Sequence, residues 1–233
     1  MARVTTLLLD GRPVPVKLVR NARARRLSLR IDPGDRSVVL VLPARAALSQ
    51  GLAFAESKAD WLRARLAAIP AGIPFVDGAS LPLAGVPHRL RHDPAGRRGV
   101  WIEADEIHVS GAPEFLARRV TDWLKRRARE EIARRVDPMP ATLGRPCRSI
   151  RLKDTRSRWG SCTSGGDLSF SWRLLLAPPM VLDYVVAHEV AHLAEMNHSP
   201  AFWRVVATLC RDAAAGRRWL KANGALLHRY GQA

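Results

Sequence analysis

The sequence predicts an α+β protein. N-terminal β-hairpins and one long helix precede a small core of antiparallel strands and a helix that carries a His-Glu-x-x-His motif. Three observations support this prediction. Short segments alternate apolar and polar residues, as half-buried strands do. Two longer segments repeat apolar residues every three or four positions, as amphipathic helices do. The motif itself follows two prolines that can start a helix.

The composition favours a folded protein without a membrane span. Of the 233 residues, 47% are hydrophobic and 25% are charged, which suffices for a core and excludes a wholly disordered chain. The longest apolar runs, such as Val38 to Leu42, fall far short of the roughly 18 residues that cross a bilayer. The first ten residues lack a secretory pattern, and three widely spaced cysteines form no disulfide framework. We therefore expect a cytoplasmic protein with no membrane partner.

The chain is strongly basic, with 38 Lys and Arg against 21 acidic residues and a net charge of +17. A field of this sign attracts polyanions such as nucleic acid. However, arginines far outnumber lysines and alanine is abundant, which a GC-rich genome produces without selection for binding. The charge is also spread over both halves of the chain. Nucleic acid is therefore a possible partner but not the first expectation.

The N-terminal part is predicted to form a hairpin and a helix. Arg26 to Ile31 alternates polar and apolar residues, a turn follows at Asp32 to Asp35, and a second strand covers Ser37 to Leu42. Ala46 to Ala68 then has the apolar spacing of a helix. The hairpin presents a basic face. The arginines that would supply phosphate contacts there are Arg23, Arg25, Arg26 and Arg30.

The middle of the chain alternates between short strands and one long helix. Pro113 to Val136 predicts a helix whose buried stripe is Leu116, Val120, Leu124, Ala128 and Ile132. The four short strands expected before it are Leu81 to Leu83, His88 to His92, Val100 to Ile102 and Glu106 to Val109. The segments expected after it are strands at Ser149 to Lys153 and Leu168 to Leu176, and a helix from Pro178-Pro179 to about Met196.

His188 and His192 lie four residues apart on this last helix, so both imidazoles leave the same face. This spacing suits one tetrahedral Zn²⁺, and Glu189 is placed to contact a water beside it. The flanking valines make the helix buried, and polar groups there are costly without a partner such as a metal ion. The motif thus predicts a zincin-type core.

The third ligand is predicted to be His198. Downstream of His192 the only acids are Glu195 and Asp212, and the only other histidine is His228. Asn197 can end the helix in the left-handed conformation and let the chain bring His198 back toward the metal. Loss of His198 without loss of zinc would point to Asp212 or Glu195 instead.

A second stretch lies just upstream of the helix, where turn residues at Thr155 to Cys162 precede an alternating strand. An exposed strand beside a metal cleft can pair with an extended peptide. A further group should stabilise the oxyanion that forms during hydrolysis. The candidates for this role are Arg173, Tyr184, His228 and Tyr230.

The run from Arg156 to Trp203, with TRSRWGSC, LSFSWRLLLAPP, LDYVVAHEVAHL and MNHSPAFW, resembles the YgjP-like metallopeptidase-domain family, which is similar in turn to the SprT-like zinc proteases. The segment His198 to Phe202 also resembles the His-Gly-x-x-Phe piece of the SprT-like proteins. The resemblance implies a zinc-peptidase core in which His188, His192 and His198 bind the ion and Glu189 is the catalytic acid/base.

We therefore expect a zinc-dependent peptidase with one Zn²⁺ per chain and a peptide or protein substrate. Residues 1–110 would form a β-rich accessory region, and residues 111–233 the metallopeptidase core. Two alternatives stay open: a DNA-associated SprT-like protein that acts on DNA-bound proteins, and a zinc-dependent amidohydrolase of a non-peptide substrate. A purely structural zinc is disfavoured because closed four-ligand sites normally include cysteines, and none lies near the motif.

Overall fold

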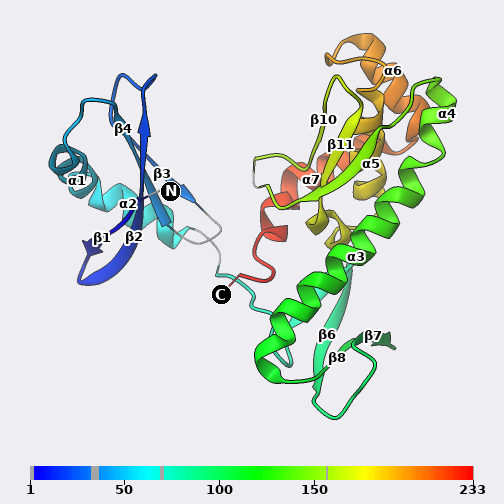
Figure 1. Ribbon diagram of the computed structural model, residues 1–233, viewed down its shortest axis with the longest axis horizontal. Coiled ribbons are helices and arrows are strands. Elements are labelled where there is room, and N and C mark those ends of the chain that lie inside the picture. Colours follow the sequence, from blue (N-terminus) through cyan, green and yellow to red (C-terminus); the bar gives the residue numbers. More distant parts are fainter. Residues whose placement is uncertain (1–2, 33–36, 69–70, 156, 233) are drawn as a thin grey trace. The chain divides into compact units, whose positions relative to one another are not determined.

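The structure, a computed structural model, has a mixed α+β fold and describes residues 3–32, 37–68, 71–155 and 157–232. It divides into two compact units, one of Met1–Gly72 with Gln232–Ala233 and the other of Ile73–Gly231. Figure 1 shows both units, and each is described by itself below. No helix in the described ranges is long and apolar enough to cross a bilayer.

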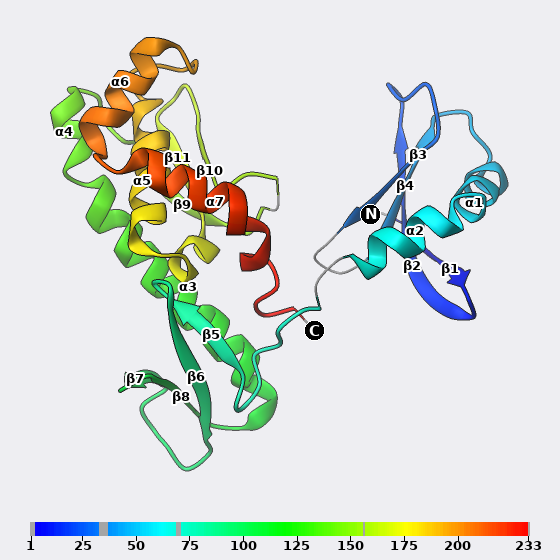
Figure 2. The ribbon, with the colours of Figure 1, turned by 180° about the vertical axis from the view of Figure 1, so that it is seen from behind.

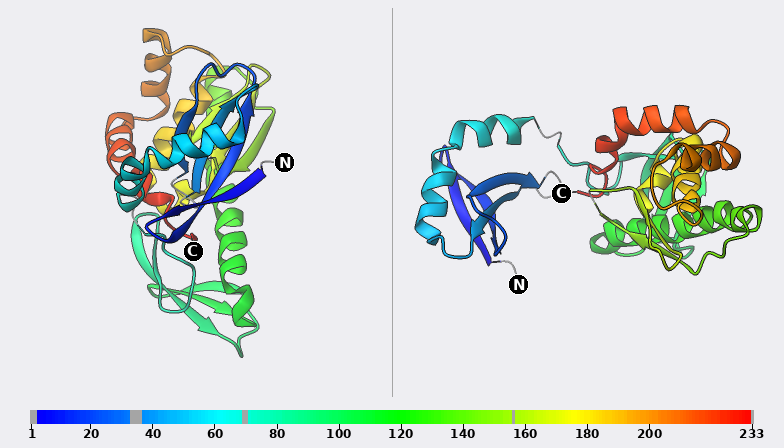
Figure 3. Two further views of the ribbon diagram at one scale, coloured as in Figure 1. Left: turned by 90° about the vertical axis from the view of Figure 1, so that its left-hand side faces the viewer. Right: turned by 90° about the horizontal axis from the view of Figure 1, so that it is seen from above.

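The first unit is a four-stranded sheet covered on one face by two helices (Figure 3). The strands, in the order β1-β2-β4-β3, are β1 (Arg3–Leu9), β2 (Arg12–Asn21), β4 (Ser37–Pro43) and β3 (Ser28–Asp32). The helices are α1 (Leu48–Glu56) and α2 (Ala59–Ala67). Leu40 from the sheet, Ala55 from α1 and Leu62 from α2 belong to one apolar cluster and are fully buried.

The predicted hairpin of β3 and β4 is confirmed, because the two strands pair antiparallel along their length. Its turn falls largely on residues 33–36, outside the described ranges. The strands β1 and β2 were not predicted; they are joined by Asp10-Gly11, both at positive φ (52° and 73°), the Asp-Gly pattern of a tight hairpin turn. The prediction of a single helix over residues 46–68 is wrong, because the structure has two helices there. The break lies at Ser57, whose hydroxyl donates to the carbonyl of Phe54.

The second unit holds two further sheets and the longest helix (Figure 1). One sheet has the order β5-β6-β8-β7 and the other β10-β11-β9. The strands are β5 (Ser80–Leu83), β6 (Val86–Asp93), β7 (Val100–Glu103), β8 (Glu106–Ser110), β9 (Ser149–Lys153), β10 (Gly160–Cys162) and β11 (Asp167–Ser171). The helices are α3 (Leu116–Val136), α4 (Met139–Leu143), α5 (Pro179–Ala191), α6 (Pro200–Leu209) and α7 (Ala213–Leu227).

The predicted helix and stripe of α3 are confirmed, apart from a short 3₁₀ turn that replaces its first residues. All five stripe residues are at most 4% exposed. They belong to a single apolar cluster that also contains residues of both sheets of the unit and of α5 along its length. The core of this unit therefore depends on the stripe that the sequence displays.

Three expectations for the second unit need correction. The strand expected to reach Leu176 ends at Ser171, whose hydroxyl accepts from the N–H of Arg173 and starts a 3₁₀-helix. The core strands are not all antiparallel, because β9 pairs parallel to β11. The motif helix ends at Ala191 rather than near Met196, since the chain turns there.

The compact units divide between Gly72 and Ile73 rather than at residue 110. Strands β5 to β8 lie with the second unit because Leu81, Leu90 and Ile107 share the cluster of α3 and α5. The assignment of residues 1–110 to an accessory role and of residues 111–233 to the peptidase core stays a prediction.

Candidate metal centre

Three histidines lie close together around the C-terminal end of α5 and the connection to α6. His188 lies in the last turn of α5, His192 caps its C-terminus, and His198 lies just before Ser199, the N-cap of α6. Each offers a ring nitrogen, and these nitrogens lie within 4.8 Å of one another. The Nε2 atoms of His188 and His198 are 3.1 Å apart. Among the described residues, neither Glu195 nor Asp212 belongs to this group, and the role of His198 as third ligand stays a prediction.

A tight turn brings His198 back to the helix end. The N–H groups of Ala194 and Glu195 both donate to the carbonyl of Ala191, which closes the chain on itself. Asn197 then accepts the N–H of Ser199 at 3.2 Å, and Ser199 accepts the N–H of Phe202 to start α6. The reversal therefore comes from hydrogen bonds within this short segment and from the cap that follows it.

Phe202 is the common support of the three imidazoles. Its ring is fully buried, and its centroid lies 4.5 Å from that of His192, 4.8 Å from His198 and 4.9 Å from His188. Aromatic pairs at such spacings contribute beyond the area that they bury. Phe202 thus restricts the tilt of all three rings at once.

The surroundings of His192 and His188 determine which ring nitrogen of each faces the cluster. The Nδ1 of His192 lies 3.0 Å from the carbonyl oxygen of Glu195. Because a carbonyl only accepts, the proton of His192 sits on Nδ1 and its Nε2 keeps a lone pair. The Nδ1 of His188 is buried and has no hydrogen-bond partner among the described residues, so Nε2 is the atom through which His188 joins the cluster.

This donor set fits a zinc ion. Two nitrogens bound to one tetrahedral Zn²⁺ at about 2.0–2.1 Å lie roughly 3.3 Å apart, close to the 3.1 Å between His188 and His198. Burial, and then the neighbouring His192 and His198, lower the pKa of His188 to about 4. Burial likewise lowers the pKa of His192. The imidazoles of His188 and His192 are therefore neutral at pH 7, the form that coordinates metal ions.

Glu189 lies beside the cluster and is only 6% exposed. Burial raises the pKa of its carboxyl to about 7, and the charge of Arg158 opposes this rise. A Cβ placed on Gly160 would lie 2.5 Å from both Cγ and Oε1 of Glu189. Only glycine fits at this position of β10, so the side chain of Glu189 packs directly against the strand backbone.

The four oxyanion candidates have different surroundings. The ring centroid of Tyr184 lies 5.8 Å from that of His188, edge-on, and burial raises the pKa of its phenol. The buried Arg173 donates to Asp154 and to the carbonyls of Leu227 and Tyr230. His228 stacks on Trp159. Of the four, Tyr184 is the one with a ring contact to the histidines in the described part of the chain, and all four catalytic roles stay predictions.

The four arginines predicted for phosphate contacts all belong to the first unit. Arg30 lies on β3, and Arg23, Arg25 and Arg26 lie in the loop before it. All four are exposed. Their nucleic-acid role stays a prediction.

Three histidines within reach of one ion, beside a buried carboxylate, form the kind of site found in metal-dependent hydrolases. The chain matches the family model described as YgjP-like, metallopeptidase domain, over residues 25–223. It therefore belongs to this family. No curated protein and no solved structure shows a significant match to it.

Removal of His198 should sharply weaken zinc binding. We expect His198→Ala to lower the affinity by more than about 100-fold, above the loss typical of a residue that only orients a ligand. The measurement is competition for zinc with a coloured chelator. His88→Ala, a histidine of β6 outside the cluster, should bind as the wild type does. Unchanged affinity in His198→Ala would reassign the third ligand.

A methyl group at position 160 should displace Glu189. We expect Gly160→Ala to leave zinc affinity within a few-fold of wild type, because the ligands are not touched, and to lower the hydrolytic rate by at least tenfold. Gly165→Ala is the matched control, since nothing lies within 3.8 Å of a Cβ there. Equal rates for the two variants would show that the close contact is unimportant.

Proposed function

We propose that this protein is a zinc-dependent peptidase. His188, His192 and His198 would hold one Zn²⁺, and Glu189 would act as the general base. The observation that carries the proposal is the set of three imidazole nitrogens within 4.8 Å of one another, next to a buried carboxylate of the same helix. Membership of a metallopeptidase-domain family supports the reaction class.

The bound ion would supply Lewis-acid activation of water and of the peptide carbonyl. Glu189 would accept the proton of the attacking water and pass it to the leaving amine. Its position is restricted by the backbone of Gly160, so the carboxylate needs little reorganisation. Tyr184, in contact with His188, would donate a hydrogen bond to the developing oxyanion.

The substrate would lie along β10. This strand is at the edge of its sheet, with β11 on one side only. An extended peptide can add to such an edge through main-chain hydrogen bonds. Since Gly160 of β10 contacts Glu189, a peptide on this edge would pass close to the base.

The direct test is Glu189→Gln. This variant should keep zinc near one ion per chain and lose roughly 10²–10⁴ in kcat, because a general base contributes about that factor. The assay is cleavage of casein or of a quenched peptide mixture by the zinc-loaded protein. Glu56→Gln, an exposed carboxylate of α1, is the control and should keep full activity. Peptide cleavage undiminished in Glu189→Gln would contradict the mechanism, and zinc-dependent cleavage of amides other than peptides would favour the amidohydrolase.

A DNA-associated protein acting on DNA-bound proteins is the second candidate. The net charge of +17 and the exposed Arg23, Arg25, Arg26 and Arg30 favour it. Duplex DNA binding that falls steeply with salt, and that weakens when all four arginines become Gln, would support this function. No binding at low salt would exclude it.

A further inference from the structure

We propose that the centre selects peptides rich in acidic side chains, through a basic groove between α3 and β9. This inference rests on the proposed peptidase function and names its substrate class. The groove, called the α3–β9 groove below, has a volume of about 430 Å³. Its cationic lining residues are Lys125, Arg126, Arg129 and Lys153.

The four cations of the α3–β9 groove are exposed and have no ion pair with any described residue. Lys125 and Arg129 are one helical turn apart on α3, and Arg126 is their neighbour, so their charges repel one another. Asp122, exposed on the preceding turn, forms no ion pair with them in the described structure. An anionic ligand would relieve this repulsion.

The one acidic residue that lines the α3–β9 groove, within the described ranges, is already neutralised. The carboxylate of Asp154 accepts from Nε of Arg173 at 2.6 Å and from Nη2 at 3.1 Å. This two-point pairing is the strong form of an Arg–carboxylate contact. The groove therefore keeps its positive charge.

Trp172 gives a second reason to expect a ligand with oxygen acceptors. It lines the α3–β9 groove, and its buried Nε1–H has no acceptor among the described residues. A buried donor without a partner costs about 1–3 kcal/mol. A carboxylate or carbonyl oxygen in the groove is the kind of group that such a donor lacks.

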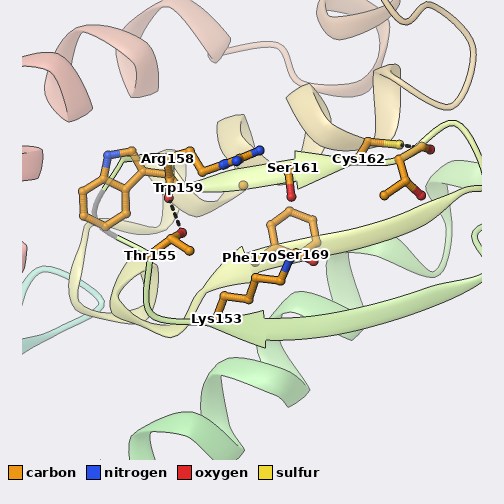
Figure 4. A pocket seen from close by; sticks show the side chains of 10 residues that line it. Lys153, Thr155, Arg158, Trp159, Ser161, Cys162, Ser169 and Phe170 are labelled. Carbon is orange, nitrogen blue, oxygen red and sulfur yellow. Dashed lines mark hydrogen bonds between the residues drawn. The ribbon is translucent and has the colours of Figure 1, made fainter. Parts of the chain in front are cut away.

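A second hollow shares a lining residue with the α3–β9 groove. Lys153 also lines a hollow of about 220 Å³ along β10, together with Arg158, Gly160 and Ser161 (Figure 4). In Figure 4 the side chain of Lys153 runs beside Ser169 and Phe170 on the face of the sheet. No acidic residue of the described chain lines this hollow. The hollow and Glu189 share Gly160 as a neighbour, and the charged residues that line the hollow in the described chain, Lys153 and Arg158, are both cationic.

These features favour a peptide over nucleic acid as the ligand. The one aromatic ring of the α3–β9 groove, in the part of the chain described, is that of Trp172, and this residue is only 2% exposed. Single-stranded nucleic acid binding relies on exposed rings for base stacking. The hollow instead lies over the sheet that ends in β10, an edge strand to which a peptide can add.

The test uses the zinc-loaded Glu189→Gln protein, so that binding is measured without cleavage. A labelled glutamate-rich peptide should bind about tenfold more tightly than its glutamine copy at low salt, and this preference should shrink as salt is added. The double variant Arg129→Glu with Lys153→Glu should lose the preference and favour a lysine-rich copy. Arg118→Glu, on α3 outside the groove, should keep it.

Equal binding of the two peptides, or a preference that survives the double charge reversal, would overturn the proposal. Labelled single-stranded DNA is the competing ligand. If it binds more tightly than the acidic peptide, and if the double variant loses this binding, the groove is a nucleic-acid site and the proposal is overturned. Wild-type cleavage of both peptides at equal kcat/KM would overturn the acidic preference alone. Charge-selective binding without any cleavage would instead overturn the peptidase function and leave the groove assignment standing.

Discussion

The structure depends on how the apolar helix α5 accommodates two polar side chains, the half-buried His188 and the buried Glu189. α5 packs Val181, Val185, Val186 and Val190 into the core, and the same helix carries His188 and Glu189. Polar side chains in such a place raise the free energy of the fold unless partners compensate them. The donors of His188, His192 and His198 converge on one point, where a cation is the compensating partner that their chemistry favours.

Close backbone approaches hold the elements around this helix. Gly160 lets β10 touch Glu189, and a Cβ on Gly216 of α7 would lie 2.6 Å from the carbonyl oxygen of Met180 and from Cβ of Tyr184. α7 therefore lies directly beside α5, as Figure 2 shows. Glycine at these two positions restricts where the side chains of Glu189 and Tyr184 can lie.

Arg173 links the site to the rest of the second unit. Its buried guanidinium joins Asp154, at the end of β9, to the carbonyls of Leu227 and Tyr230 near the C-terminus. Breaking a buried ion pair by removing one partner is strongly destabilising, because the remaining charge stays uncompensated. These contacts argue for a structural role, and the same pairing with Asp154 leaves the cations of the α3–β9 groove unneutralised.

Local patterns in the sequence determined the elements and the donors. The apolar stripe predicts α3 and the alternation of residues predicts β3, because burial of one face imposes the period of a helix or a strand on the sequence. The i, i+4 spacing of His188 and His192 follows from helix geometry alone. The sequence does not predict the break at Ser57, because the helical spacing of apolar residues continues across it. The ranges of β1 and β2 depend on the turn at Asp10-Gly11, which apolar periodicity does not reveal.

Only the tertiary structure decided which distant segments meet at the site. Phe202 packs against the three histidines, the backbone at Gly160 packs against Glu189, and α3 and β9 together line the basic groove. The contacts of Gly160 with Glu189 and of α3 with β9 join residues that no local period relates, so packing alone brings them together. The sequence by itself therefore determined the three histidines and the glutamate of the candidate site, while packing decided which side chains surround them.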